Sequence, residues 1–350
     1  MTIDIAKVTQ DFSERRYSMS KMDVYNKLFT DCTLAEIEGF TLFNMFHHHY
    51  RPFNCALILV QRPGARMVMT EYAWDQRGYS LKPEAVPIVI LQPGGPVNLL
   101  YDKEDVYSRN KQLRFDGFDD EYRFPDKGKN IDELTYERWK NAVHSKGIRV
   151  SENRSGEARY GRASSLNAPM QITFAAFEKG VKKTKSILAH HQIVINSSLP
   201  THEKALTILH ELGHLYCGHV PGKRTDKNGL PPYRFDDLLT ELKRINAEQE
   251  KIRKQLASLE ASGNSPEQAD DLKKRADELN EYESRLIRKN RDPKEYEAEL
   301  VCKILSQRNN FQNDSSEEYL RSHSPGGKIP DISLESVMEA VEKIAGILDI

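Results

Sequence analysis

Cysteines, long apolar runs and an excess of charge of one sign are all scarce in this sequence of 350 residues. The four cysteines form no C-x-x-C pair and their spacing does not indicate a disulfide framework, so reduced thiols are expected. Because the sequence has no run of about 18 apolar residues, we expect no membrane-spanning helix. With 51 Lys and Arg against 52 Asp and Glu, the chain has no overall attraction for nucleic acid or for an anionic membrane.

The first residues, MTIDIAKVTQDFSERRYS, are too polar to form a signal peptide, so we expect a soluble, cytoplasmic protein. Hydrophobic residues make up 38% of the chain, which is enough for a buried core. The length favours two domains over one very large domain. The overall class that we expect is α+β.

Short apolar segments separated by Pro and Gly turns fill the N-terminal part. Residues 53–60 lie between Pro52 and Pro63-Gly64, and we interpret them as a buried helix, with a strand as the alternative. Together these segments predict a small α+β domain over residues 1–125. The other expected elements are strands at 67–69, 87–91 and 97–101 and the start of a short helix at 72–74.

A second α+β unit, residues 130–350, is expected after an aperiodic connection rich in Asp, Gly and Lys at about 115–130. Residues 170–174 and 192–196 have the composition of strands. The second strand leads into a helix that is expected to begin near Thr201. We expect residues 192–196 to form an edge strand that could pair with an extended substrate backbone.

Within this unit the composition changes sharply over residues 235–291, where Leu, Glu, Lys, Arg and Gln dominate. Apolar residues there follow alternating steps of four and three, which is the heptad pattern of a coiled coil. We predict an inserted antiparallel coiled-coil hairpin with its break near residues 261–266. The alternative is a solvated, charged helix with no partner. The expected seam is Leu238, Leu242, Ile245, Ile252, Leu256, Leu259, Leu272, Leu279 and Leu286, with Gln249 in the vacant position.

The strongest chemical signal is the segment His210-Glu211-Leu212-Gly213-His214, an HExxH pattern. On a helix, residues four apart lie on one face, so both imidazoles can reach one zinc ion. Glu211 would lie where it can take a proton from water at the metal, as a general base. The alternative is a helix that carries two ordinary histidines.

A third ligand is needed, and a His at position 220 is absent because Val220 stands there. His219 is out of register for a ligand, so we place it in a loop or beside a ligand. Glu295 is the better candidate, on a helix that we expect to start at Asp292-Pro293. Glu299, one turn further on, would hold His214 or His210 through its second ring nitrogen.

Three further expectations accompany this third-ligand assignment. Ala298 is small, so it lets the two helices approach closely. Glu297 is expected to point elsewhere. The alternative for all these glutamates is a solvated helix face.

HELGH followed by an E-x-x-A-E helix at residues 295–299 resembles the gluzincin-type arrangement of ImmA/IrrE and ArdC-like metallopeptidases. Residues 53–63, 72–74 and 87–93 are similar to the N-terminal domain of ArdC-like antirestriction proteins, and residues 316–320 resemble that family's closing segment. The resemblance implies a zincin-like domain that binds Zn²⁺ and cleaves a protein substrate. It also implies an N-terminal domain that binds single-stranded DNA. The hairpin lies outside the family pattern.

A set of cations near aromatic residues provides candidates for contacts to single-stranded DNA, because bases can stack on rings while cations follow phosphates. The alternative is a small core with a solvated rim. The alternative function is a DNA-binding antirestriction or defence module in which protein and DNA contacts matter more than proteolysis. The candidate residues are Arg51, Arg62, Arg66, Trp74 and Arg77.

Three remaining features have less specific interpretations. His47-His48-His49 is interpreted as a polar linker, because adjacent histidines do not share a face. Cys217 and Cys302 are expected to be buried packing residues. The hairpin is expected to bind a protein partner or a second copy of the chain, or to recruit substrate, since its tip would lie far from the zinc.

Overall fold

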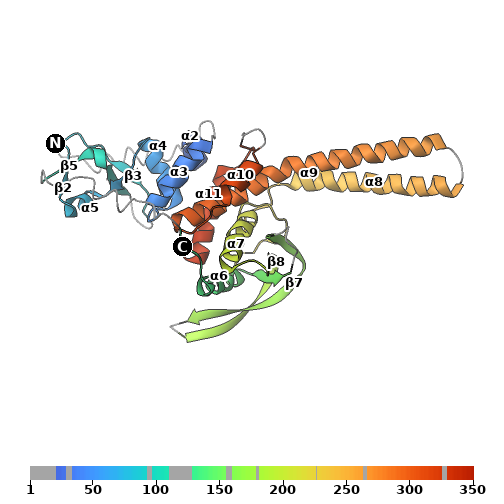
Figure 1. Cartoon of the computed structure of the whole chain (residues 1–350), viewed down its shortest axis with the longest axis horizontal. Helices are drawn as coiled ribbons and strands as arrows, with labels where there is room; N and C mark the ends of the chain where they lie inside the picture. Colours follow the sequence, from blue (N-terminus) through green and yellow to red (C-terminus); the bar gives the residue numbers. More distant parts are fainter. Residues whose placement is uncertain are drawn as a thin grey trace.

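The computed structural model shows a helical body with three projections, and confirms the α+β class (Figure 1). A small N-terminal unit lies on one side of the body, a long pair of helices extends from the opposite side, and a two-stranded β-ribbon extends below. None of the helices in the described part of the chain combines the length and apolar character needed to cross a membrane. The structure describes residues 21–28, 34–92, 97–109, 128–154, 160–178, 181–225, 227–262, 266–324 and 329–350.

The N-terminal unit contains the expected short elements. The segment after Pro52 is a helix rather than a strand, with Pro52 at its first turn and six buried residues. Two small antiparallel sheets follow, in the orders β1-β4-β3 and β2-β5. The elements are α2 Lys21–Leu28, α3 Leu34–Phe46, α4 Pro52–Gln61, β1 Val68–Met69, α5 Glu71–Gln76, β2 Tyr79–Leu81, β3 Ile88–Ile90, β4 Asn98–Asp102, the 3-10 turn η1 Lys103–Asp105 and β5 Val106–Ser108.

One hydrophobic core joins the helices of this unit to the C-terminal helices. Phe40 of α3 and Ile58 of α4 belong to the same buried cluster as Trp139 and Val341 further along the chain. Arg308 adds polar contacts, because its guanidinium donates to Asn44 Oδ1 (3.0 Å) and to two backbone carbonyls that follow α3. The N-terminal unit is therefore packed onto the body. The expected connection at 115–130 lies largely outside the described residues.

The second sheet places the strand that leads into the HExxH helix at its centre. Its order is β6-β8-β7, formed by β6 Ile148–Asn153, β7 Gly161–Glu178 and β8 Val181–Asn196. Residues 192–196 pair in parallel with β6 and antiparallel with β7. The expectation of an edge strand at 192–196 is therefore wrong. The parallel partner β6 is separated from β8 in the sequence by the whole of β7, so the local pattern of residues 192–196 does not reveal it; α6 Glu133–Ser145 comes before β6.

The helical body consists mainly of α7 Thr201–Tyr216, α9 Pro266–Arg308 and α11 Leu334–Leu348, with the short α10 Ser316–Ser322 alongside. The expected helix start at Asp292-Pro293 is wrong, because α9 continues through Pro293. Proline removes one helical hydrogen bond, but a helix can continue where packing holds it. Here Tyr296 and Ala298, just beyond the proline, are fully buried. Asp292 Oδ1 accepts from His323 Nδ1 (3.1 Å) instead of capping a helix.

The long projection is a hairpin of α8 Asp236–Ser262 and the first half of α9, which lie side by side (Figure 1). The antiparallel direction follows from cross-contacts: Tyr282 donates to Glu241, and Gln249 donates to Asn280 Oδ1 (2.9 Å). Ile245 and Ile252 of the expected seam are buried. At the heptad position between these two isoleucines, Gln249 makes a hydrogen bond to the facing helix instead of an apolar contact. The coiled-coil assignment itself stays a prediction.

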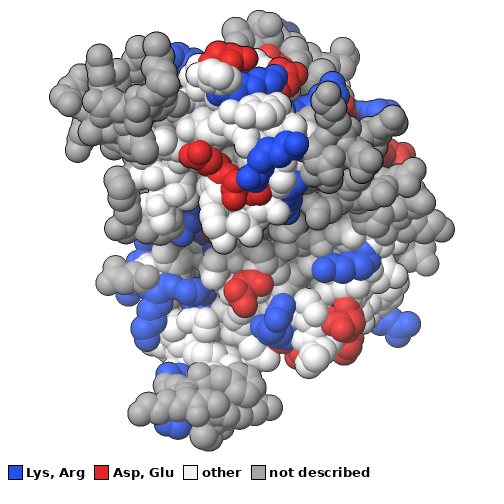
Figure 2. Space-filling view, turned by 90° about the vertical axis from the view of Figure 1, so that its left-hand side faces the viewer, with Lys and Arg blue, Asp and Glu red and all other residues white. Residues whose placement is uncertain are grey.

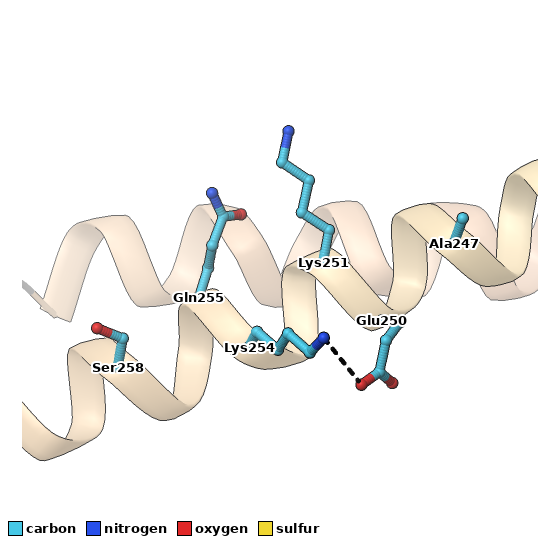
Figure 3. Close-up of a pocket in the computed structure, with 6 residues that line it drawn as sticks. All are labelled: Ala247, Glu250, Lys251, Lys254, Gln255 and Ser258. Carbon is cyan, nitrogen blue, oxygen red and sulfur yellow. Dashed lines mark ion pairs between the residues drawn. The ribbon is translucent and has the colours of Figure 1, made fainter.

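A shallow hollow on α8 contains only residues of that helix (Figure 3). Its side chains are mostly charged or polar, and the ion pair of Lys254 with Glu250 spans 4.0 Å along one helix face. An ion pair between exposed side chains four residues apart contributes little to stability. We therefore interpret this surface as a solvated helix face. The hollow is lined by Ala247, Glu250, Lys251, Lys254, Gln255 and Ser258.

The hairpin should be dispensable for the stability of the body. Among the described residues, the main core cluster includes none between Leu230 and Tyr296. Replacing residues 246–281 with a short Gly-Ser linker should therefore leave the melting temperature of the body within a few degrees of wild type. Differential scanning calorimetry measures this, and loss of the cooperative transition would contradict an independent arm.

Candidate metal centre

The site forms where α7 and α9 come into contact at two small residues. A Cβ atom on Gly213 would lie 2.9 Å from both Cα and the carbonyl oxygen of Ala298. The backbones therefore approach more closely than any side chain on Gly213 would allow. This contact brings the histidine face of α7 against Glu295 and Glu299 of α9, as the sequence predicted for Ala298.

Three donor side chains converge between the two helices. His210 Nε2 and His214 Nε2 lie 3.2 Å apart, and each lies 3.5 Å from Glu295 Oε2. One ligand atom from each residue falls within 4.8 Å of the others. Two imidazoles and a carboxylate are the donor set of catalytic zinc sites, which leave further positions open. The residues present therefore fit a zinc ion.

Hydrogen bonds within the donor group shift the pKa values of Glu295 and His210 against the effect of burial. Burial alone would raise the pKa of Glu295, but hydrogen bonds with His210 and His214 outweigh it and hold that pKa far below its ordinary value. Burial alone would lower the pKa of His210, but its bonds to Glu295 and Glu299 raise it. A proton and a metal ion compete for the same place between these side chains.

Glu299 supports His210. His210 Nδ1 lies 2.9 Å from Glu299 Oε2, and Ser316 Oγ donates to the other oxygen of the same carboxylate. With its proton on Nδ1, His210 keeps the lone pair of Nε2 for the centre. The sequence left open which histidine Glu299 would hold, and the structure assigns it to His210.

His219 and Glu297 form a second arrangement behind His214. His219 joins His214 through the two Nδ1 atoms (2.9 Å) and Glu297 through Nε2 (2.8 Å). Burial lowers the pKa of His219 to about 4, so its ring is neutral. Burial alone would raise the pKa of Glu297, but bonds from His219 and Arg234 hold it below its ordinary value.

Sequence reasoning placed Glu297 away from the zinc but missed this role. The sequence offered no signal for it, because the complete burial of Glu297 between Tyr296 and Ala298 appears only in the folded chain. Cys217, His219 and Glu297 also lie close enough to hold a metal ion together. Glu297 is already engaged by Arg234 through both oxygens, so that second group is a less suitable metal site.

Glu211 is buried beside the first residue of β7. A Cβ atom on Gly161 would lie 3.0 Å from Glu211 Oε1 and would also collide with Thr207. The strand therefore passes directly over the carboxylate that follows the first histidine. Glu211 therefore lies directly beside the backbone at the start of β7.

A cavity of about 910 Å³ opens over the three donors. Its walls come from the beginning of β7, from α7 and from α10, and the root of the hairpin closes another side. Tyr319 of α10 donates to Glu295 Oε2 (2.8 Å), and burial raises the pKa of its hydroxyl. Apolar residues of the hairpin root that line the cavity are Leu238, Leu239, Leu242 and Ile287.

The candidate DNA contacts lie in different environments. Trp74 is wrong as a stacking residue, because it is fully buried and its indole donates to Tyr101 O (2.9 Å). Arg62 is paired with Asp105 (3.0 Å). Arg51, Arg66 and Arg77 are exposed. On the side facing the viewer in Figure 2, basic and acidic side chains of the described residues are intermingled.

The first histidine of the tract and the described cysteines are buried, whereas His48 and His49 are exposed. The linker interpretation of residues 47–49 is wrong for His47, which is buried at the end of α3 with Nε2 2.9 Å from Arg66 O. Burial lowers the pKa of His47 to about 4. Cys217 and Cys302 are buried, as expected, and burial raises the pKa of both thiols. Cys32 lies outside the described residues.

With this geometry in place, comparison with known proteins adds one finding. Residues 167–237 match the Peptidase_M78 family model, the IrrE N-terminal-like domain. The match indicates a metallopeptidase-type domain, and it contains both histidines and Glu211. It ends where the hairpin begins, so Glu295, Glu297 and Glu299 lie beyond it. The ArdC-like resemblance of the N-terminal part has no counterpart in this match. Neither the curated proteins nor the solved structures provide a match.

Gly213→Ala tests the close contact of α7 and α9. The added methyl group meets backbone atoms of Ala298, and overpacking of this kind costs about 1–3 kcal/mol. The variant should melt at a lower temperature and retain less metal. Gly346→Ala in α11 is the matched control, because its Cβ has open space and should be neutral or stabilise by up to about 1 kcal/mol. Equal melting temperatures for both variants would contradict the contact.

Glu295→Ala tests the donor set. Removing a donor should weaken metal retention by more than the roughly 10–100-fold cost of losing a supporting group. Metal content per chain after dialysis against a weak chelator measures the loss. Glu203→Ala is the control, since Glu203 lines the same cavity without belonging to the donor group. Unchanged metal content in Glu295→Ala would shift the assignment to Glu299.

Proposed function

We propose that this protein is a zinc-dependent peptidase that hydrolyses peptide bonds of a polypeptide substrate. The observation that carries the proposal is the convergence of His210, His214 and Glu295 below a cavity that also contains Glu211. The match of residues 167–237 to a metallopeptidase-type domain supports the same reaction class. The proposal includes a polypeptide as the substrate and a bacterial or mobile-element regulatory or defence process as the biological context.

His210, His214 and Glu295 would hold the zinc ion. When bound there, zinc acts as a Lewis acid and makes water nucleophilic near neutral pH. The protein's own contribution is to fix the donors: Glu299 orients His210, and the contact at Gly213 holds both helices at the required separation.

Glu211 would act as the general base. It would accept a proton from the attacking water and deliver it to the leaving amine. Its burial against Gly161 supports this role, because the carboxylate would lie beside a substrate backbone paired with β7. Tyr319 is the best candidate to stabilise the developing oxyanion, because its hydroxyl already reaches Glu295 and lines the cavity.

The substrate would pair with β7 rather than with β8. Among the described strands, β7 is the edge nearest the site, and it contributes Gly161, Arg162 and Ala163 to the cavity wall. Asn196 N donates to Tyr160 O (2.9 Å), so the backbone carbonyl of Tyr160 points towards β8. Along an antiparallel strand, successive residues point their backbone groups alternately towards and away from the partner strand. Backbone groups of Gly161 and Ala163 then face away from β8, where an extended substrate can pair with them.

The root of the hairpin would select part of the substrate. Leu242 and Ile287 present apolar surface to the same cavity. Arg291 lines this wall as well. We therefore expect a bulky apolar substrate side chain on this side of the scissile bond, because burial of such a side chain contributes about 1.5–3 kcal/mol.

Glu211→Gln tests the proposed reaction. The variant keeps the shape of the side chain and all three metal donors but cannot accept the proton. Hydrolysis of a fluorescence-quenched random peptide library should fall roughly 10²–10⁴-fold while the zinc content stays unchanged. Glu203→Gln, on the same helix and in the same cavity, should retain activity. Activity near wild type in Glu211→Gln would contradict this role.

A further inference from the structure

The two histidines of the donor set are supported in different ways. His210 contacts the carboxylate of Glu299 directly. His214 instead contacts His219, and only the far side of that ring reaches a carboxylate, that of Glu297. One imidazole is therefore interposed between His214 and its anion. Both His219 and Glu297 have side chains only 1% exposed, so bulk water does not replace either contact.

The hydrogen bonds allow only one arrangement of protons when His214 binds the metal through the lone pair of Nε2. His214 then carries its proton on Nδ1 and donates it to Nδ1 of His219. His219 must carry its own proton on Nε2, which donates to Glu297 Oε2. The carboxylate accepts at the end of this chain. All three groups are satisfied, with no donor facing a donor.

Glu297 is itself held firmly. Arg234 donates to both carboxylate oxygens, from Nη1 to Oε2 (2.5 Å) and from Nη2 to Oε1 (3.1 Å). The backbone N–H of Ser333 donates to Oε1 (2.6 Å). A buried carboxylate needs such partners, because an unpaired buried charge is strongly destabilising. These bonds fix the position of the oxygen that His219 contacts.

Arg234 lies at the root of the hairpin. Its backbone N–H donates to Gly218 O (3.0 Å) and its guanidinium donates to Cys217 O (3.1 Å), so it is bound to the end of α7. The next residue, Phe235, has its ring 5.7 Å from that of His219, and α8 begins immediately afterwards. The base of the hairpin is thus packed against the support of His214.

We propose that Arg234, Glu297 and His219 are positioning residues that fix the ring of His214 for metal binding, which makes the root of the hairpin part of the metal site. The inference rests on the proposed zinc function for its ligand, but it does not require peptidase activity. It assigns a role to Arg234 and Glu297 that the HExxH pattern does not contain. A displacement of the hairpin root would change metal affinity through these contacts.

A matched pair of substitutions at His219 isolates the acceptor. In His219→Asn, the side-chain oxygen can stand near the place of Nδ1 and accept from His214. His219→Leu has a similar shape but no acceptor, and both variants lose the bond to Glu297. Zinc affinity, measured by competition with a chromogenic chelator, should fall roughly 10–100-fold in the Leu variant and clearly less in the Asn variant. Equal losses in the two variants, or wild-type affinity in the Leu variant, would overturn the proposal.

Arg234→Met tests the contribution of the hairpin root. Zinc affinity should fall roughly 10-fold, and the visible absorption spectrum of the Co²⁺-loaded protein should shift because the geometry of His214 changes. Arg224→Met is the control, since Arg224 binds backbone carbonyls in the same loop without contacting Glu297. Equal effects in both variants would show that loop stability alone is involved, which would contradict the proposal.

The proton order can be read independently of zinc. In the metal-free protein, side-chain ¹⁵N chemical shifts should show His219 protonated on Nε2, and a proton on Nδ1 instead would overturn the arrangement. Failure of the wild-type protein to bind zinc would refute the proposed function, while this tautomer measurement would still decide the role of Glu297. If the protein binds zinc but does not hydrolyse peptides, the zinc affinities of the His219 and Arg234 variants still decide whether these residues position His214.

Discussion

The close approach of α7 and α9 is the constraint on which the rest of the site depends. Gly213 and Ala298 leave no room for a larger side chain between the two helices. Because of this contact, residues separated by more than 80 positions, such as His210 and Glu295, have donor atoms 3.5 Å apart. The same approach brings Glu297 next to His219, at the opposite end of the contact. A single packing interaction therefore sets both the donor group and its support.

The site could be predicted from the sequence where the chemistry is local. The spacing of His210 and His214 on one helix required only helical periodicity. Glu295 and Glu299 followed from the need for a third donor and a supporting carboxylate. Glu297 and Arg234 could not be assigned in this way, because an ion pair between two separate segments depends on how they pack. Nothing in their local sequence distinguishes them from the many charged residues of a solvated helix.

The fold shows the same division. Short elements between Pro and Gly turns, such as α4 and β4, follow local signals and were predicted correctly. The central position of β8 depends on a parallel partner that lies far earlier in the sequence, so periodicity alone could not reveal it. Pro293 resembled a helix start, but burial of the following turn keeps α9 continuous. Trp74 looked like a stacking surface, whereas it fills the core of the small N-terminal sheets.

The central claim is that a zinc ion occupies the space between the two histidines and Glu295. Anomalous diffraction from a crystal of the zinc-loaded protein, recorded on both sides of the zinc absorption edge, tests it most directly. We expect one strong anomalous peak bonded to His210 Nε2, His214 Nε2 and the Glu295 carboxylate. A peak at Cys217, His219 and Glu297 instead, or no peak between the two helices, would contradict it.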